Sequence, residues 1–247
     1  MKIQVNNSKK ETSKKAAQQA AEILKESINK KNKATFIAAT GLSQTDFLDY
    51  LSQDPGIDWS KTEMFHLDEY VGIPETHPAS FRKYLKERFI EKVHPGTVHL
   101  INGSSDKPDK EVARLNQLIA DKEIDVAFIG IGENGHVAFN DPPADFETKD
   151  PFIVVTLDQA CKKQQVGEGW FASLEDVPSK AITMSASQIM KSNNIICTVP
   201  GDRKAEAVKK CFEGDISPHY PASILKKHDN AFIYLDQDSA QLLEKTT

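Results

Sequence analysis

Residues 125–142 read DVAFIGIGENGHVAFNDP, and this stretch decides the fold class. It opens with a continuous, mostly apolar run over residues 125–131, which is typical of a parallel strand covered on both faces. Three glycines then fall within six positions, from 130 to 135, and predict a tight loop where the strand ends. We therefore expect this segment to be one unit of an α/β sheet.

Short β-rich runs alternate with helical patterns on both sides of this segment. The predicted strands cover residues 2–5, 34–39, 62–67, 125–131, 152–156, 181–184, 194–199 and 231–235. The predicted helices cover residues 12–32, 43–53, 80–90, 106–122, 201–212 and 221–227, and Ser43 is expected to cap the second of them. This alternation predicts a doubly wound, mostly parallel sheet flanked by helices, a modified Rossmann-like fold.

No linker rich in proline, serine or glycine divides the chain. We therefore expect a single domain over residues 1–247, with a small lid around residues 157–180. A chain of 247 residues is long enough to bury a core without disulfide or metal staples.

Composition excludes several classes of protein. The chain has 31 basic and 36 acidic residues and a net charge of −5, which argues against a nucleic-acid partner but allows a small anionic substrate. No stretch approaches the ~20 apolar residues of a membrane helix, and residues 1–10 lack the apolar core of a signal peptide. Cys161, Cys197 and Cys211 form no paired motif, so we expect a reducing cytoplasmic location, with neither disulfides nor zinc.

Ligands of such sheets collect beyond the carboxyl ends of the strands, which directs attention to the loops that follow predicted strands. One of them contains Thr40, Gly41, Leu42 and Ser43, where a glycine, a hydroxyl and free N–H groups at a helix start suit a phosphate. A plain strand–turn–helix with a serine cap fits this loop equally well.

Lys204 follows another predicted strand, in the first turn of the helix over residues 201–212. The helix dipole disfavours a cation at that place, and a bound phosphate would explain it. A surface lysine with its ammonium in water is the alternative.

Two further loops carry groups that could transfer protons. In residues 66–70, HLDEY, one of the adjacent carboxylates Asp68 and Glu69 could act as a general base. Solvated loop acids are the alternative, and a metal site with His66 lacks further ligands nearby.

The glycine-rich loop adds Glu133, Asn134, His136 and Asp141. His136 could transfer a proton and Asp141 could orient its ring, although a lone loop histidine is often only a surface residue. Together, an anion site, a carboxylate and a histidine–carboxylate pair suit the ring opening and enolisation of a phosphorylated sugar.

Longer motifs give the sequence a family resemblance. Residues 65–72 (FHLDEYVG) and 77–81 (HPASF) resemble the F-x-x-D-E-Y-x-G and H-P-x-S-Y stretches of the glucosamine-6-phosphate deaminases, also called glucosamine-6-phosphate isomerases. Residues 130–142 resemble their G-x-G-x-x-G-H-x-A-F-N-E-P loop, and matches within 177–228 continue in family order. The resemblance spans nearly the whole chain. The 6-phosphogluconolactonases belong to the same fold group as this family.

The resemblance implies a role for each matching residue. Asp68 matches the base that moves a proton between C2 and C1, and His136 matches the residue that opens the sugar ring. Asp141 matches the partner of that histidine. The implied phosphate and substrate contacts are Thr40, Gly41, Leu42, Ser43, Gly135 and Lys204. The implied reaction converts glucosamine 6-phosphate and water into fructose 6-phosphate and ammonia, with no metal or organic cofactor.

The sequence departs from the family pattern at several of these positions. Asn134 stands where many members have an aspartate of the histidine network, and an amide can orient a partner but cannot relay a proton. Asp141 replaces a glutamate and is one methylene shorter. Residues 40–44 read TGLSQ where the family often has T-G-G/S-T-P. Lys162 is the expected substitute for a second phosphate-binding arginine, without its bidentate geometry.

Three other functions stay open on the sequence. A galactosamine-6-phosphate deaminase would share every motif. A 6-phosphogluconolactonase usually continues its loop with T/A-x-S-L-F-P and has an arginine where Tyr70 stands. A non-catalytic sugar-phosphate-binding protein of the regulator type would normally add a helix-turn-helix, and residues 1–33 predict only one helix. The expected partner is a small sugar phosphate, with no nucleic acid or membrane, and a homo-oligomer stays open.

Overall fold

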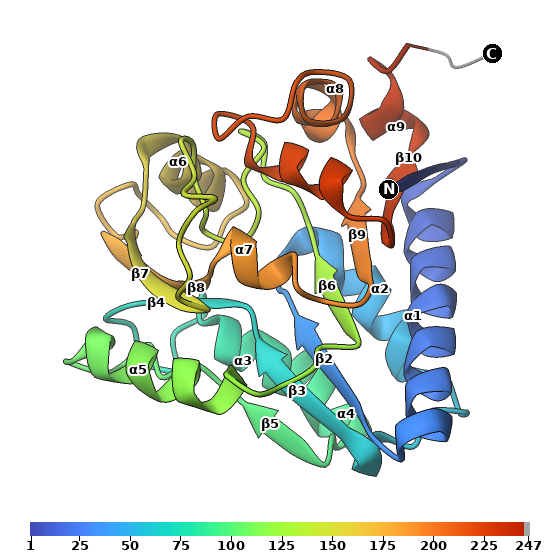
Figure 1. Cartoon of the computed structure of the whole chain (residues 1–247). Coiled ribbons are helices and arrows are strands. Elements are labelled where there is room, and N and C mark those ends of the chain that lie inside the picture. The colour runs from blue at the N-terminus through green and yellow to red at the C-terminus, as the bar shows by residue number, and fades with distance from the viewer. Residues whose placement is uncertain (245–247) are drawn as a thin grey trace.

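A central sheet of seven parallel strands organises the computed structural model, which describes residues 1–244 (Figure 1). Its strand order is β1-β10-β9-β6-β2-β3-β5, and all six pairings are parallel. The strands are β1 (Lys2–Asn6), β2 (Ala34–Ala38), β3 (Thr62–His66), β5 (Thr97–His99), β6 (Val126–Ile129), β9 (Ile195–Val199) and β10 (Ala231–Asp236). The predicted doubly wound α/β sheet is confirmed, with β5 as a short edge strand that the sequence pattern does not reveal.

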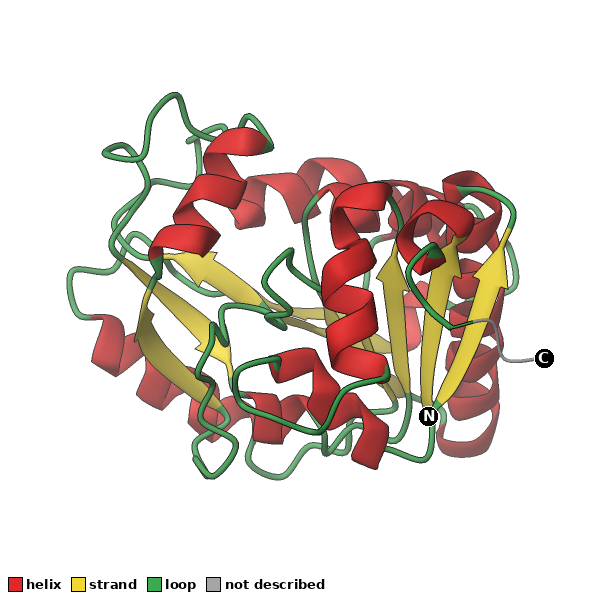
Figure 2. Cartoon of the chain, turned by 90° about the horizontal axis from the view of Figure 1, so that it is seen from above, coloured by secondary structure: helices red, strands yellow, loops and turns green. Residues whose placement is uncertain are grey.

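Helices cover both faces of this sheet, as Figure 2 shows. The α-helices are α1 (Lys9–Lys31), α2 (Leu42–Ser52), α3 (Phe81–Leu85), α4 (Glu91–Val93), α5 (Pro108–Ile119), α6 (Gln159–Gly167), α7 (Ala186–Ile189), α8 (Ala205–Phe212) and α9 (Gln237–Ala240). A π-helical turn over Lys86–Ile90 joins α3 to α4, and 3₁₀ turns cover Trp59–Lys61, Asp202–Lys204 and Pro221–Lys227. The segment predicted as a helix over residues 221–227 is therefore a 3₁₀ helix.

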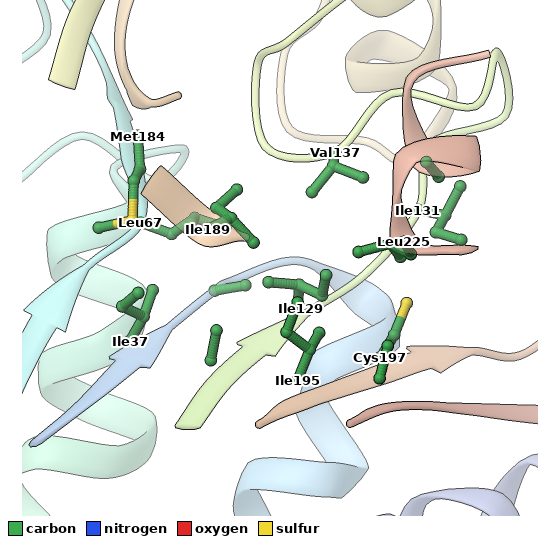
Figure 3. Close-up of a cluster of buried hydrophobic side chains, with 14 of the residues drawn as sticks. Ile37, Leu67, Ile129, Ile131, Val137, Met184, Ile189, Ile195, Cys197 and Leu225 are labelled. Atoms are coloured by element: carbon green, nitrogen blue, oxygen red, sulfur yellow. The ribbon is translucent and has the colours of Figure 1, made fainter. Parts of the chain in front are cut away.

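The side chains of each central strand alternate between two hydrophobic cores. Phe36 of β2 and Phe128 of β6 pack on one face against α1 and α2. Their neighbours Ile37 and Ile129 point to the other face, where Figure 3 shows them gathered with Ile189 of α7 and other apolar side chains. Burial on both faces explains why these strands read as continuous apolar runs.

A second, smaller sheet stands beside the central one. It has three antiparallel strands in the order β4-β8-β7, namely β4 (Asp68–Tyr70), β8 (Lys180–Met184) and β7 (Phe152–Thr156). The sequence predicts β7 and β8 as strands but assigns them to the single large sheet, and it predicts residues 68–70 as a loop. Both assignments are wrong, because residue composition does not say which sheet a strand joins.

A third apolar cluster fills the space between this small sheet and the segment around α6. Tyr70, Phe139, Cys161 and Phe171 are buried members of it. The expected single domain and the expected lid over residues 157–180 stay predictions. Among residues 1–244, no helix combines the length and apolar character that crossing a membrane requires.

Candidate active site

The loops that follow β2, β3, β6 and β9 meet at one cavity of about 260 Å³. All four loops singled out from the sequence contribute to its wall, as expected at the carboxyl edge of a parallel sheet. Residues 159–170, which include α6, close a further side of it. Of the expected site residues, those that line the cavity are Thr40, Gly41, Leu42, Ser43, Asp68, His136 and Lys204.

The loop after β2 has the backbone geometry of an anion site. Gly41 is the N-cap of α2 at a φ of +95°, a conformation that glycine adopts without strain. No side chain of residues 1–244 caps this helix, so N–H groups of its first turn stay available to a ligand. Ser43 lies within that first turn, and the expectation that it is the cap residue is wrong.

Gln44 ties this loop to the two neighbouring strands β6 and β9. Its buried amide donates to the Thr198 hydroxyl at 2.7 Å and to the Ile129 carbonyl at 3.0 Å. Tyr84 supports the loop from the other side, since its hydroxyl donates to the Gly41 carbonyl at 3.1 Å. The candidate phosphate loop is therefore held by β6, β9 and α3 before any ligand arrives.

The loop after β9 places two cations at the cavity. Gly201, at a φ of +99°, donates its N–H to both carboxylate oxygens of Asp236, at 3.1 and 3.0 Å. Lys204 ends the 3₁₀ turn that follows, and no other side chain of residues 1–244 pairs with its ammonium. Burial lowers the pKa of Lys204, against the opposing charges of Glu168 and Glu133.

Arg203 differs from Lys204 because it already has a partner. Its guanidinium lies 2.6 Å from the Glu133 carboxylate on the glycine-rich loop. This ion pair joins the loop after β9 to the loop after β6 across the cavity. Lys204 is thus the cation left for an anionic ligand, which supports the phosphate interpretation over that of a solvated surface lysine.

Asp68 is a buried carboxylate rather than a solvated loop acid. It begins β4, lines the cavity and is only 6% exposed. Burial, with a smaller contribution from the charge of Glu69, raises the pKa of Asp68 to about 8. A carboxyl group with a pKa near neutrality is suited to accept and return a proton.

The neighbouring carboxylate of Glu69 has a structural role. It is fully buried and forms a salt bridge with Arg82 at 3.2 Å. It also accepts hydrogen bonds from the Ser80 hydroxyl at 2.9 Å and the Arg82 backbone at 2.9 Å. Because successive strand residues face opposite ways, Asp68 reaches the cavity and Glu69 anchors the start of α3.

His66 does not join Asp68 in a metal site. It is fully buried at the end of β3, outside the cavity wall, and its Nδ1 accepts the Ile101 N–H at 3.5 Å. Burial, together with the charge of Arg82, lowers the pKa of His66 to about 3. A neutral histidine suits this packed position.

The glycine-rich loop holds His136 against Asp141. His136 Nδ1 lies 3.2 Å from Asp141 Oδ1, an ion-pair distance without the alignment of a linear hydrogen bond. Although burial opposes it, the adjacent His136 ring lowers the pKa of Asp141. The shorter aspartate thus still reaches the histidine, while Asp141 itself lies behind the ring and not in the cavity wall.

Asn134 orients this pair through both ends of its amide. Its oxygen accepts the backbone N–H of His136 at 3.1 Å, and its nitrogen donates to Asp141 at 3.4 Å. Gly132 is required for the close approach of the ring, since a Cβ there would lie 2.2–2.4 Å from His136 atoms. Asn134 therefore acts in the histidine network as a hydrogen-bonding partner and not as an acid.

Cys161 of α6 completes a three-residue group behind the cavity. Its sulfur and the ligand-type atoms of His136 and Asp141 all lie within 4.8 Å of one another. Burial raises the pKa of the Cys161 thiol, as does the charge of Asp141.

Two expected contacts lie outside the cavity wall, and α6 supplies others instead. Neither Gly135 nor Lys162 is part of the wall, so their substrate contacts stay predictions. The wall residues that the sequence did not single out include Gln164 and Gln165 of α6, and Glu168 and Trp170 just after it. They fall inside the expected lid, which was the only sequence signal for them.

The comparisons with known proteins agree with this geometry. A family model for glucosamine-6-phosphate isomerases/6-phosphogluconolactonase matches residues 7–234. A protein of Oenococcus oeni (strain ATCC BAA-331 / PSU-1), named glucosamine-6-phosphate deaminase, is 33% identical over 99% of this chain and 100% of its own. One of Streptococcus pyogenes serotype M1, with the same name, is 36% identical over 90% of this chain and 92% of its own.

Solved structures show the same relationship. A monomeric glucosamine-6-phosphate deaminase is similar with a TM-score of 0.89 and 32% identity, over 98% of this chain and 100% of that one. The 6-phosphogluconolactonase of Trypanosoma brucei has a TM-score of 0.81 at 17% identity, over 98% of each chain. The second similarity is one of fold alone.

Proposed function

The chain belongs to the family of glucosamine-6-phosphate isomerases and 6-phosphogluconolactonases, and we propose that it is an amino-sugar-phosphate deaminase. The reaction converts glucosamine 6-phosphate and water into fructose 6-phosphate and ammonia. Because water enters and ammonia leaves, we place the enzyme among the hydrolases, although an aldose–ketose isomerisation forms its first half. The observation that carries the proposal is the buried, proton-accepting Asp68 in one cavity with His136 and an anion site.

The geometry supports a sequence of proton transfers. The loop at 40–43 and Lys204 hold the phosphate and orient the sugar, which lowers the barrier by positioning. His136, held by Asp141, transfers the proton that opens the ring to the aldehyde form. Asp68 then takes the proton from C2 and returns it to C1, and the C2 imine that results is hydrolysed by water to release ammonia.

The relatives favour the deaminase over the lactonase. The two curated relatives and the solved structure at 32% identity are named deaminases, whereas the lactonase structure is only 17% identical. Tyr70 and the sequence 137–142 also follow the deaminase pattern. The two deaminase substrates, glucosamine 6-phosphate and galactosamine 6-phosphate, are distinguished by the assay below and not by the fold.

Two wider proposals follow from the same family. We propose a cytoplasmic location, supported by three buried cysteines that are all free thiols. A homo-oligomer stays a prediction, and one related deaminase of solved structure is described as monomeric. Sedimentation of the purified chain would measure its state of association.

An ammonia-release assay tests the function. The enzyme is incubated with glucosamine 6-phosphate, galactosamine 6-phosphate and, separately, 6-phosphogluconolactone. Stoichiometric ammonia and ketose phosphate from one of the amino sugars supports the proposal. Hydrolysis of the lactone without ammonia release from either amino sugar would overturn it in favour of the lactonase.

A further inference from the structure

Gln165 is a buried amide in the cavity wall that the reaction sequence does not use. It lies on α6 and is only 5% exposed, yet it faces the same cavity as Asp68 and His136. A buried polar side chain normally has partners for both ends of its amide. The hydrogen-bond partners of Gln165 therefore indicate the role of this side chain in the cavity.

Among the described residues, only one end of this amide has a hydrogen-bond partner. Gln165 Oε1 accepts a hydrogen bond from the Tyr70 hydroxyl at 2.6 Å. Tyr70 is fully buried in β4, so this bond fixes the orientation of the amide. No acceptor among residues 1–244 pairs with Gln165 Nε2, which leaves a donor available at the cavity.

The preceding residue shows the contrast. Gln164 also lines the cavity, but its Oε1 accepts the Glu133 N–H at 3.0 Å and its Nε2 donates to Glu168 at 2.7 Å. Both ends of that amide are therefore used, one in holding α6 to the glycine-rich loop and the other at the C-terminal end of α6 itself. Among these two neighbouring glutamines, only Gln165 offers a free hydrogen-bond donor to a ligand.

The position of Gln165 along α6 indicates which part of a ligand it meets. Its partner Tyr70 is two residues from Asp68 on β4, which places Gln165 toward the proton-transfer end of the cavity. Glu168, almost one turn further along the helix, lies near Lys204 at the anion end. A sugar phosphate that spans these ends presents its hydroxyl-bearing carbons to the helix.

We propose that Gln165 recognises the sugar by donating a hydrogen bond from Nε2 to a hydroxyl oxygen of its carbon chain. This inference rests on the proposed function for the identity of the substrate. A neutral amide donor neither neutralises the phosphate nor accepts a proton from C2. Gln165 is thus a specificity-determining residue, and it depends on Tyr70 for its orientation.

Calorimetric titration of the purified protein with fructose 6-phosphate and with inorganic phosphate tests the proposal. Gln165→Met keeps the length of the side chain and removes the donor. It should weaken the binding of fructose 6-phosphate by about five- to tenfold, the effect of one hydrogen bond, and leave the binding of inorganic phosphate unchanged. Tyr70→Phe should cause a smaller loss for fructose 6-phosphate alone.

Two further variants guard against damage to the fold. The double variant Tyr70→Phe/Gln165→Met leaves no buried hydroxyl unpaired and should show the same selective loss as Gln165→Met. Lys163→Met, an exposed position on the same helix, should bind both ligands as the unsubstituted protein does. Thermal melting of each variant reports its folding.

The outcomes separate this inference from the proposed function. Binding of fructose 6-phosphate at unchanged affinity by Gln165→Met, or equal losses for both ligands, would overturn the role of Gln165. The same holds if the unsubstituted protein fails to bind fructose 6-phosphate at all. A selective loss in a protein that binds the sugar but releases no ammonia would support the role and contradict the deaminase.

Discussion

Adjacent residues acquire opposite roles in this cavity. Asp68 and Glu69 have the same charge, but one is held without a cation at the cavity and the other is paired with Arg82. The difference arises from strand alternation, which turns their side chains to opposite faces. The chemistry of the site thus depends on the direction of a side chain as much as on its type.

Replacing Asp68 by asparagine should reduce kcat by about a hundred- to ten-thousand-fold, because the amide cannot accept the proton from C2. The side-chain volume is nearly unchanged and the variant buries no charge, so the melting temperature should not fall. Steady-state kinetics and a thermal melt measure both effects. Asp215→Asn, at an exposed acid with no hydrogen bond or ion pair to residues 1–244, is the charge-matched control. Turnover within tenfold of the unsubstituted enzyme would disprove the assignment of the base.

The pH dependence of kcat/KM should also reveal Asp68. The carboxyl must be ionised to act as the base, and burial raises its pKa to about 8. Hence kcat/KM should fall about tenfold for each pH unit below 8 and level off above it. A pH–rate profile between 5 and 10 measures this limb. An acid limb near pH 4 would mean that Asp68 is solvated in the free enzyme.

At the scale of elements, the glycine-rich loop determines where the catalytic histidine lies. Gly132→Ala should lower kcat/KM by about a hundredfold, since its methyl group would occupy the place of the His136 ring and displace it. Gly56→Ala, where the nearest atoms belong to the flexible Lys25 and Asp54 side chains, is the matched control and should leave activity unchanged. Similar kinetics for both variants would show that the ring is not held as described.

The sequence predicts the elements better than their arrangement. Strands β2, β6 and β9 are recognisable in the sequence as continuous apolar runs, because both faces of the central sheet are covered. Residues 68–70 escape detection, since three polar or aromatic residues carry no periodicity and pair only through β8, more than a hundred residues away. Motif residues such as His136 can be predicted from the sequence, because the residues that form their loop are close together in the chain.

The contribution of α6 could not be predicted in the same way. Gln164 and Gln165 lie in a helix whose N-cap, Asp158, is its only strong start signal. Their place in the cavity depends on how β7 and β8 carry the segment back over the sheet. Contacts with Tyr70 and Glu133, distant in sequence, orient the two amides. Glu168 then accepts from Gln164, and Gln165 is left with a free donor.

On the scale of the whole molecule, a charge cluster links stability to pH. Glu63 of β3 is buried in contact with Lys33, with Lys122 at 2.9 Å and with His99 at 2.7 Å. Burial alone would raise the pKa of Glu63, but hydrogen bonds from these three groups lower it to about 2. Because the folded-state pKa is depressed, the stabilisation is complete above the unfolded value near 4.5 and is lost as pH falls toward 2.

Glu63→Gln should therefore flatten the pH dependence of unfolding. At pH 7 the variant should lose about 1–3 kcal/mol of its free energy of unfolding, since the lysines lose their counter-charge. Between pH 4.5 and 2 the two proteins should converge. Urea unfolding at a series of pH values measures the difference, and a constant offset down to pH 2 would contradict the role of the cluster.

The most direct test of the proposed function measures both products, ammonia and fructose 6-phosphate, in one reaction with glucosamine 6-phosphate. Ammonia and fructose 6-phosphate should appear at equal rates, with the rate greatly reduced in Asp68→Asn. Absence of ammonia from glucosamine and galactosamine 6-phosphates alike, in a protein shown to be folded, would contradict the assignment of this cavity as a deaminase active site.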